Sequence, residues 1–565
     1  MMKMKKITVL LVVLMALFLQ ACGSSSSGVV QTIAPTISYK FSSDYNTSTV
    51  TITNNLSGAT VRYTTDGSEP TTDSKEYIGT FDITDSGNLI KTKAFKDGLS
   101  NSDTISASIP VGKKALTIMY YGDGDNNLET YLLEDIEEMK NGFNSSGDYN
   151  LITLFDRIPS YSSNSATFGE NFDDSRLYKI GKGITTRLGG WTEFPEIKRD
   201  YSYEANMGDA NTLKKFIQYC KANYPADKYV LIISNHGGGA KTLKSTSSSI
   251  TKDICQDVTN GGDIMYTGEM LDILTLDESI NVMVLDACLM GSVEFAYQFR
   301  KDNGGFNSEY MVASPALVDA KGLPYDTILS SIVDTYNMSI LSKLIVSKQY
   351  DKMKNDSSQT FSAYDLSKMT GLKTSIDTFS KAIVGASEKI DFESIRGTDS
   401  SNTAMNYFDS SDEEEWIEYP FFDIYDLMKK VNNSSKFSDE FKGYANNVQI
   451  ALGNVILSSF GGSEFTGFTN NKNGMHIIFP KEAVSLYDSV SQADKNYWSL
   501  SVLYWYTPTN LNTLTNGAKL YGNLSFCSGG SENGIVENWF EMIDYWYDNN
   551  TSSVNSGKGY NYCKY

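Results

Sequence analysis

The chain is poor in histidine, with only two among its 565 residues, His236 and His476. It is also short of positive charge, because 48 Lys and Arg stand against 68 Asp and Glu and leave a formal net charge of −20. Phosphate binding needs a basic face, so this balance argues against nucleic acid or an anionic membrane surface as the main partner. An acidic surface instead attracts cationic molecules.

Cysteine is scarce too, with six residues in the whole chain. Six are too few for a disulfide scaffold. Cys220 falls on the apolar face of a predicted helix and is expected to be a buried structural thiol. Cys527 and Cys563 can form a disulfide outside the cytoplasm, but the sequence does not establish that they come within bonding distance.

A long membrane-spanning run is also missing. The apolar run Ile7–Leu19 follows three lysines and is short for a span, so Met1–Ala21 is predicted to be a signal peptide. Leu19-Gln20-Ala21-Cys22 resembles a bacterial lipobox, which implies cleavage before Cys22 and a lipid on its thiol; the alternative is an ordinary secretory signal. Residues 22–32, with Gly23–Gly28 (GSSSSG), form a flexible tether. The sequence thus predicts an exported protein anchored by lipid on the bacterial cell envelope.

Residues 33–112 have the pattern of a small all-β sandwich. Short alternating runs are separated by turn-forming Asp66-Gly67 and Asp97-Gly98. The run Val61–Thr71 (VRYTTDGSEPT) resembles the immunoglobulin-like module at the C-terminus of chitobiases. That resemblance implies a spacer or a carbohydrate-adjacent accessory domain.

Residues 113–506 alternate strand-length apolar runs with amphipathic helices. One such helix follows Asn206–Asp209 and places Leu213, Phe216, Ile217 and Cys220 on one face. The alternation predicts an α/β fold with a mostly parallel sheet flanked by helices. Residues 507–565 are a C-terminal extension, in which Asn538–Tyr547 (NWFEMIDYWY) is predicted to be a helix packed on the main body.

Two apolar strands end in polar, glycine-flanked residues that suit one catalytic centre. They are Tyr229–Gly239 (YVLIISNHGGG) and Ile280–Gly291 (INVMVLDACLMG). Loops at the carboxyl ends of neighbouring parallel strands meet in one crevice, so His236 and Cys288 can face each other there. Attack by a thiol on an acyl carbon needs a base that later protonates the leaving amine, and imidazole suits both steps. The Gly237 N–H, together with that of Cys288, can form an oxyanion hole.

Other readings of these residues remain open at this point. His236 can merely cap a turn, and Cys288 can be a buried small hydrophobe. The rival base, His476, lies in Gly474–Pro480 (GMHIIFP), which is predicted to be a core strand. The rival nucleophile, Cys255, follows no clear strand.

The two motifs, strand–His–Gly and strand–Asp–Ala–Cys, resemble the clostripain-like cysteine peptidases, relatives of caspases, legumains and gingipains. One departure is the segment after the histidine, where family members often carry an aromatic and this chain has Gly238, Gly239 and Ala240. Further stretches match in order over roughly residues 115 to 506: Tyr120–Glu129, Phe155–Arg157, Asn206–Asp209, Ser362–Leu366, Phe422–Leu427 and Gly474–Pro480.

The resemblance implies a caspase-like fold and a cysteine endopeptidase acting on proteins or peptides. Cys288 would be the nucleophile and His236 the base and acid. A competing hypothesis is a surface-binding lipoprotein that keeps the fold as a non-catalytic scaffold.

Asp286 is predicted to form the floor of the first specificity pocket. It lies two residues before Cys288, so alternation in an extended segment puts both side chains on the same side. Desolvating a carboxylate without a cationic partner is costly, which favours Arg or Lys just before the cut bond. The clostripain-like resemblance implies the same role. The alternative is that Asp286 only caps the following helix.

Self-cleavage is predicted between the two catalytic residues. Ala240–Asp257 (AKTLKSTSSSITKDICQD) is rich in Ser and Thr and suits an exposed loop, the kind that proteases cut most readily. Of its lysines, Lys252 is favoured, because it follows the flexible part; the alternative is that the lysines only solubilise the loop. Clostripain-like enzymes are often activated by cleavage in this interval.

No cofactor is required by this chemistry and no metal site is assigned, although the resemblance makes calcium possible. Asp173-Asp174 and Ser411–Glu415 could bind it loosely, but such runs are more often solvated surface. The stretch Asp123–Glu134 has four EF-hand liganding positions but carries Leu128 where the loop needs glycine. A capping box, with Asn126 as the cap and Glu129 reaching back, explains this stretch better.

Overall fold

The structure is a computed structural model that describes residues 31–84, 88–107, 109–158, 160–239, 254–332, 337–384, 389–396, 404–408, 421–479, 524–528 and 535–548. The chain divides into two compact units, Met1–Gly112 and Lys113–Tyr565. The predicted signal peptide, the predicted lipidation site Cys22 and the predicted cleavage residue Lys252 lie outside the described residues. Within those ranges, no helix has the length and apolar character that crossing a membrane requires.

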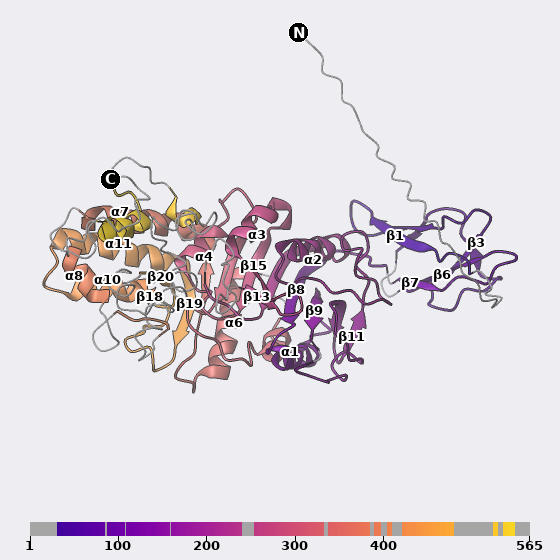
Figure 1. Ribbon diagram of the computed structural model, residues 1–565, viewed down its shortest axis with the longest axis horizontal. Coiled ribbons are helices and arrows are strands. Elements are labelled where there is room, and N and C mark those ends of the chain that lie inside the picture. Colours follow the sequence, from indigo (N-terminus) through magenta and orange to yellow (C-terminus); the bar gives the residue numbers. More distant parts are fainter. Residues whose placement is uncertain are drawn as a thin grey trace, which may run out of the picture. The chain divides into compact units, whose positions relative to one another are not determined.

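The first unit is a small antiparallel β domain, as predicted (Figure 1). Gly67 and Gly98 have positive φ angles of 79° and 80°, so the two predicted Asp-Gly turns need the conformational freedom of glycine. One sheet has the order β1 (Thr36–Phe41), β2 (Ser48–Thr53) and β5 (Phe81–Ile83), and the other β4 (Lys75–Glu76), β3 (Thr60–Thr64), β6 (Ile90–Phe95) and β7 (Ile105–Ala107).

The second unit is built on a nine-stranded sheet with a parallel centre. The strands β9, β8, β12, β15 and β16 run parallel, whereas the strands at each edge are antiparallel. In sheet order the strands are β11 (Ile184–Arg187), β10 (Arg176–Gly181), β9 (Tyr149–Arg157), β8 (Lys114–Gly124), β12 (Ala226–Ser234), β15 (Ile280–Asp286), β16 (Ser308–Ala313), β17 (Thr360–Asp365) and β19 (Ile456–Gly461). The predicted α/β class with a mostly parallel sheet is confirmed.

Two two-stranded ribbons accompany this sheet. One pairs β13 (Ile254–Asp257) with β14 (Asp263–Met265), and the other pairs β18 (Phe421–Asp423) with β20 (His476–Ile478). Strand β13 of the first ribbon forms the last four residues of the interval Ala240–Asp257, in which self-cleavage is predicted.

Helices cover both faces of the large sheet. Successive residues of a strand point to opposite faces, so each face presents its own set of side chains to the helices that pack on it. In β8, Tyr120 packs in the core beneath α1, whereas Tyr121 packs in the core beneath α2, and Figure 1 shows these helices on opposite sides of the strand. The first face holds α1 (Glu129–Gly142), α5 (Tyr325–Ser330) and α6 (Met338–Met353). The second holds α2 (Ala210–Asn223), α3 (Thr267–Ile273), α4 (Val293–Gln298), α7 (Met369–Val384), α8 (Lys389–Arg396), α10 (Ile424–Asn433), α11 (Asp439–Val455) and α14 (Trp539–Asp548).

Helix α2 follows the sequence prediction closely. Asp209 caps it by accepting a hydrogen bond from the Asn211 N–H, and the four predicted apolar residues, Cys220 among them, are fully buried. Burial raises the pKa of the Cys220 thiol well above its ordinary value, which fits an inert structural cysteine.

The start of helix α1 differs from the predicted capping box. The Asn126 side chain does accept a hydrogen bond, from the Leu128 N–H at 2.9 Å. Glu129, however, does not reach back to Asn126 but pairs with Arg157 at 2.7 Å, with both side chains fully buried. A buried guanidinium needs an anionic partner, and this demand overrides the local capping preference.

The C-terminal helix α14 packs into the main core. Trp539 is 1% exposed, and its indole N–H donates to the Ile478 carbonyl oxygen at 2.9 Å. Cys527 is buried nearby, whereas Cys563 lies outside the described residues, so their pairing stays a prediction.

Candidate active site

The two motifs predicted to be catalytic leave the sheet side by side. Strands β12 and β15 are parallel neighbours in which Ser234 lies opposite Asp286. His236 and Cys288 each follow two residues later, at the carboxyl ends of these strands. The expected meeting of the two loops at one edge of a parallel sheet is therefore observed.

The backbone of Gly237 lies directly against that of Cys288. A Cβ at position 237 would press on the Cys288 carbonyl oxygen and come within 2.8 Å of its amide nitrogen. Real Cβ atoms do not approach backbone so closely, so only glycine fits here. The contact brings the peptide groups of the two motifs together, as a shared oxyanion hole requires.

The imidazole of His236 is held by Asn127. Its Nε2 lies 2.8 Å from the Asn127 Oδ1. An amide oxygen only accepts hydrogen bonds, so Nε2 carries the proton in this arrangement and Nδ1 carries the basic lone pair. Asn127 was not among the predicted catalytic residues, because its stretch suggested a helix start or an EF-hand-like loop.

Cys288 differs from the other described cysteines in its access to solvent. Cys220, Cys255 and Cys527 are buried, whereas Cys288 is partly exposed. Its Sγ accepts a hydrogen bond from the Val318 N–H at 3.3 Å, and the thiol donates to the Val318 carbonyl oxygen at 3.9 Å. The next residue, Leu289, has a φ of 63°, so the chain turns sharply just after the thiol, in a conformation that costs non-glycine residues energy.

Asp286 lies beneath the loop that contacts Cys288. Its Oδ2 accepts hydrogen bonds from the Leu323 N–H at 3.0 Å and the Tyr325 hydroxyl at 2.8 Å. Its Oδ1 has no hydrogen-bond partner among the described residues, and burial raises the pKa of the carboxyl. Asp286 does not cap the next helix, since Ser292 caps α4 through the Phe295 N–H.

Comparison with known proteins agrees with this geometry. The sequence model of the Clostripain family matches residues 120–546. Clostripain of Hathewaya histolytica is 39% identical over 498 residues, which cover 82% of this chain and 93% of that protein. The chain belongs to the clostripain family. It is a cysteine endopeptidase, as the motifs predicted.

Two solved structures are similar to this chain at lower sequence identity. One is a secreted cysteine protease from Bacteroides thetaiotaomicron in complex with an irreversible peptide inhibitor, at 19% identity and a TM-score of 0.45, covering 69% of this chain and 98% of that one. The other is an inactive zymogen protease from Parabacteroides distasonis, at 17% identity and a TM-score of 0.47, covering 69% and 99%.

The family matches also bear on the other parts of the chain. The Chitobiase/beta-hexosaminidase C-terminal domain matches residues 42–106, in the antiparallel β unit. The clostripain-family match continues past residue 506 to residue 546. Helix α14 thus belongs with the peptidase match and shares its core.

The rival residues are unsuited to catalysis in this clostripain-family fold. Cys255 is fully buried in β13, and burial raises the pKa of its thiol. His476 is fully buried in β20 and stacks on Phe421; burial lowers the pKa of its imidazole to about 3. A histidine that stays neutral in the core does not exchange protons near neutral pH.

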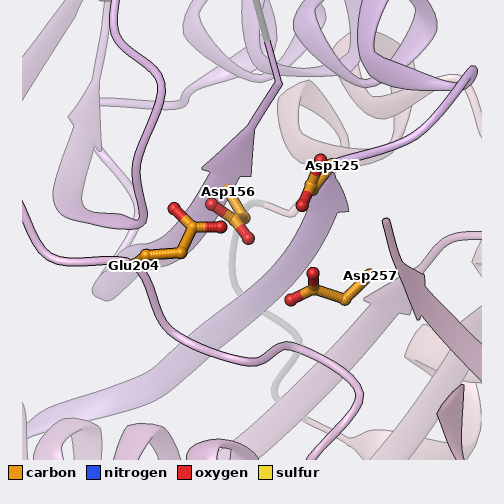
Figure 2. A group of neighbouring side chains, drawn as sticks. All are labelled: Asp125, Asp156, Glu204 and Asp257. Carbon is orange, nitrogen blue, oxygen red and sulfur yellow. The ribbon is translucent and has the colours of Figure 1, made fainter. Parts of the chain in front are cut away.

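The sequence candidates for a loose metal site are Asp173-Asp174 and Ser411–Glu415. Asp174 is buried against Arg176 at 2.5 Å, and Ser411–Glu415 lie outside the described residues. A different set of acids meets in the fold: Asp125, Asp156, Glu204 and Asp257 converge in space (Figure 2). Only Asp125 belonged to the EF-hand-like stretch.

Proposed function

We propose that this clostripain-family enzyme cleaves peptide bonds after Arg or Lys through a dyad of Cys288 and His236. The observation that carries the proposal is the parallel pairing of β12 with β15. One of the two motifs directly follows each of these strands, so the pairing brings the motifs together. Asp286, whose Oδ1 has no hydrogen-bond partner among the described residues, supports the basic specificity.

The reaction begins with attack of the Cys288 sulfur on the acyl carbon. His236 takes the thiol proton at Nδ1, while Asn127 keeps the ring oriented by accepting the hydrogen bond from Nε2. The developing oxyanion receives hydrogen bonds from the Gly237 and Cys288 amides. His236 then gives the proton to the leaving amine, and an acyl-enzyme remains.

Water completes the cycle at the same residues. His236 removes a proton from water, which attacks the thioester carbon, and the same proton then returns to the departing Cys288 sulfur. The oxyanion hole acts a second time. This sequence releases the carboxylate product and restores the dyad.

The basic side chain before the cut bond enters a pocket that ends at Asp286. A guanidinium or ammonium there supplies a charged partner for the Oδ1 atom, which has none in the described part of the chain. The buried setting strengthens this pairing relative to an exposed one, so a neutral side chain leaves a costly unpaired carboxylate.

The wider context of the enzyme is part of the same proposal. Cys22 carries a lipid that holds the enzyme on the cell envelope, and cleavage at Lys252 activates it. The antiparallel β unit serves as a spacer or a carbohydrate-adjacent accessory.

A peptide library scanned at the residue before the cut bond tests the proposal. Wild type, tested both before and after incubation to allow self-processing, should cleave after Arg and Lys only, while Cys288→Ala and His236→Ala should be inactive but folded. Cleavage retained by Cys288→Ala, or no preference for basic residues in wild type, would overturn it.

A further inference from the structure

The loop between β16 and α5 contacts both the thiol and the specificity carboxylate of the proposed mechanism. The Val318 N–H donates to the Cys288 Sγ at 3.3 Å, and the Leu323 N–H donates to the Asp286 Oδ2 at 3.0 Å. Both contacts come from one short stretch of chain. Whatever fixes this loop therefore also fixes Asp286 relative to Cys288.

A tight turn at Gly322 lies directly against Asp286. The φ angle of Gly322 is 56°, and a Cβ at this position would lie 2.6 Å from the Asp286 Oδ2. The carboxylate is not free to move aside, because the Tyr325 hydroxyl also donates to Oδ2, at 2.8 Å. Only glycine fits here, and its backbone forms the wall that keeps Asp286 in place.

Lys352 of α6 holds the same turn. Its Nζ donates to the Lys321 and Gly322 carbonyl oxygens at 3.0 and 3.1 Å. The Gly322 carbonyl and the Leu323 N–H belong to one peptide group, so Lys352 is bonded to one end of this group and Asp286 to the other. Because a peptide group is planar, a hydrogen bond at its oxygen orients the N–H and also polarises it. A chain of hydrogen bonds thus runs from the ammonium to the carboxylate.

Lys352 also supplies positive charge to a group of acids around this loop. Burial raises the pKa values of Asp286, Asp135 and Glu138, and the charge of Lys352 acts against the rise at each of them. Glu138 in turn accepts a hydrogen bond from the Tyr325 N–H at 3.0 Å, so α1 anchors the far end of the loop. The nearby ammonium therefore favours the ionised form of Asp286, the form that binds a cation.

We propose that Lys352 is a positioning residue for basic specificity: it fixes the Gly322–Leu323 peptide, which holds the Asp286 Oδ2 and leaves Oδ1 to the substrate cation. This inference rests on the proposed function, in which Asp286 is the floor of the first pocket. Oδ1 has no hydrogen-bond partner in the described part of the chain, so the bonds to Oδ2 set where Oδ1 lies. Lys352 acts through the peptide group and not on the substrate itself.

The alternative is that Lys352 only stabilises its own helix. It lies in the last turn of α6, where a cation interacts favourably with the helix dipole whatever the state of Asp286. Lys348 is a matched control, because it lies one turn earlier on α6 and lines the same surface cavity as Lys352. The hydrogen bonds to the turn come from Lys352. Only the positioning role depends on the charge of Asp286.

The first test is a kinetic double-mutant cycle on the full chain, with peptides cleaved after Arg. Lys352→Met, Asp286→Asn, their double variant and Lys348→Met are assayed after the incubation that allows self-processing. Lys352→Met should raise KM about tenfold with kcat almost unchanged, whereas a loss of folded enzyme would lower kcat alone. In the Asp286→Asn background it should change kcat/KM less than about twofold, because the charge through which it acts is gone. Lys348→Met should match wild type.

A second cycle measures stability and needs no catalysis. Melting temperatures are recorded for the same variants of the full chain with Cys288→Ala, which cannot cut itself. Lys352→Met should lower the melting temperature more when Asp286 is present than in the Asp286→Asn background, because coupled residues do not contribute additively. Lys348→Met should shift the melting temperature equally in both backgrounds.

An independent variant reaches Asp286 from the turn and leaves Lys352 in place. Gly322→Ala sets a methyl group against the Asp286 Oδ2, so it should raise KM for cleavage after Arg as Lys352→Met does. Gly304→Ala is its control, because Gly304 also has a positive φ, of 82°, but its Cβ would meet nothing within 4 Å. This control should keep the wild-type KM.

Two results would overturn the inference. One is an effect of Lys352→Met on kcat/KM or on melting temperature that is the same in both backgrounds, which would make it a residue of helix stability alone. The other is a wild-type KM after Arg in both Lys352→Met and Gly322→Ala. Failure of the proposed function looks different: Asp286→Asn would then cleave after Arg as wild type does, and the stability cycle would still decide whether Lys352 acts on Asp286.

Discussion

Gly237 and Cys288 are packed backbone to backbone at the point where their two strands end. A Cβ on residue 237 would press on the Cys288 carbonyl oxygen and the Ala287 side chain. The oxyanion-hole role proposed for both amides depends on this contact, because any side chain at 237 would push the two motifs apart.

Gly237→Ala should therefore lower kcat by about 10²-fold or more, the loss typical when an oxyanion-hole donor is displaced. Overpacking should also cost about 1–3 kcal/mol of stability. Gly371→Ala is the matched control, because its Cβ would meet nothing within 4 Å. A Gly237→Ala enzyme with wild-type kcat would exclude the role, and steady-state kinetics with a melting curve decide it.

The second prediction concerns Asn127 as a positioning residue. Asn127→Ala should reduce kcat about tenfold or more with little change in KM, because the imidazole loses its hydrogen-bonded orientation. Asn127→Asp should move the acid limb of the kcat/KM profile to higher pH, since a carboxylate favours the charged imidazolium. A merely structural Asn127 would leave that limb where it is in wild type.

The third prediction concerns the charge of Asp286. Asp286→Asn keeps an acceptor for the Leu323 N–H and the Tyr325 hydroxyl, so the fold should survive. Its kcat/KM after Arg should fall by about 10²-fold or more, since breaking a buried ion pair costs about 3–5 kcal/mol. Retained cleavage after Arg by this variant would show that the pocket is elsewhere.

The fourth prediction is self-processing between His236 and Cys288. Purified wild type should run as two fragments whose new N-terminus lies between residues 240 and 257, whereas Cys288→Ala should stay intact. Lys252→Ala should move the cut or slow it, while Lys241→Ala should not. N-terminal sequencing identifies the bond, and a wild type that is fully active as one unbroken chain would remove the proposal.

Local patterns in the sequence were enough to predict the α/β fold class and to single out His236 and Cys288 as the candidate dyad. Apolar runs ending in His-Gly and Asp-Ala-Cys predicted two parallel strands, because such runs suit a sheet covered on both faces. Leu213, Phe216, Ile217 and Cys220 of α2 were predicted from helical spacing alone.

Features that depend on distant partners were missed or misread. Asn127 contacts His236 across 109 positions, so nothing in its neighbourhood indicated that role. Glu129 was assigned to a capping box because Arg157, its buried partner, could not be placed beside it. The acidic cluster combines residues from 125 to 257, which no continuous calcium-loop motif can represent.

Covalent labelling of the chain with an acyloxymethyl ketone carrying an Arg side chain tests the central claim most directly. After the incubation that allows self-processing, mass spectrometry of the digested protein should find the label on Cys288 alone. His236→Ala should abolish labelling. Asp286→Asn should be labelled much less by the Arg-bearing ketone than wild type is, and its preference should shift toward an analogue that carries a neutral side chain. Label on another cysteine, or equal labelling of wild type and His236→Ala, would contradict the assignment of Cys288 and His236 as the catalytic pair.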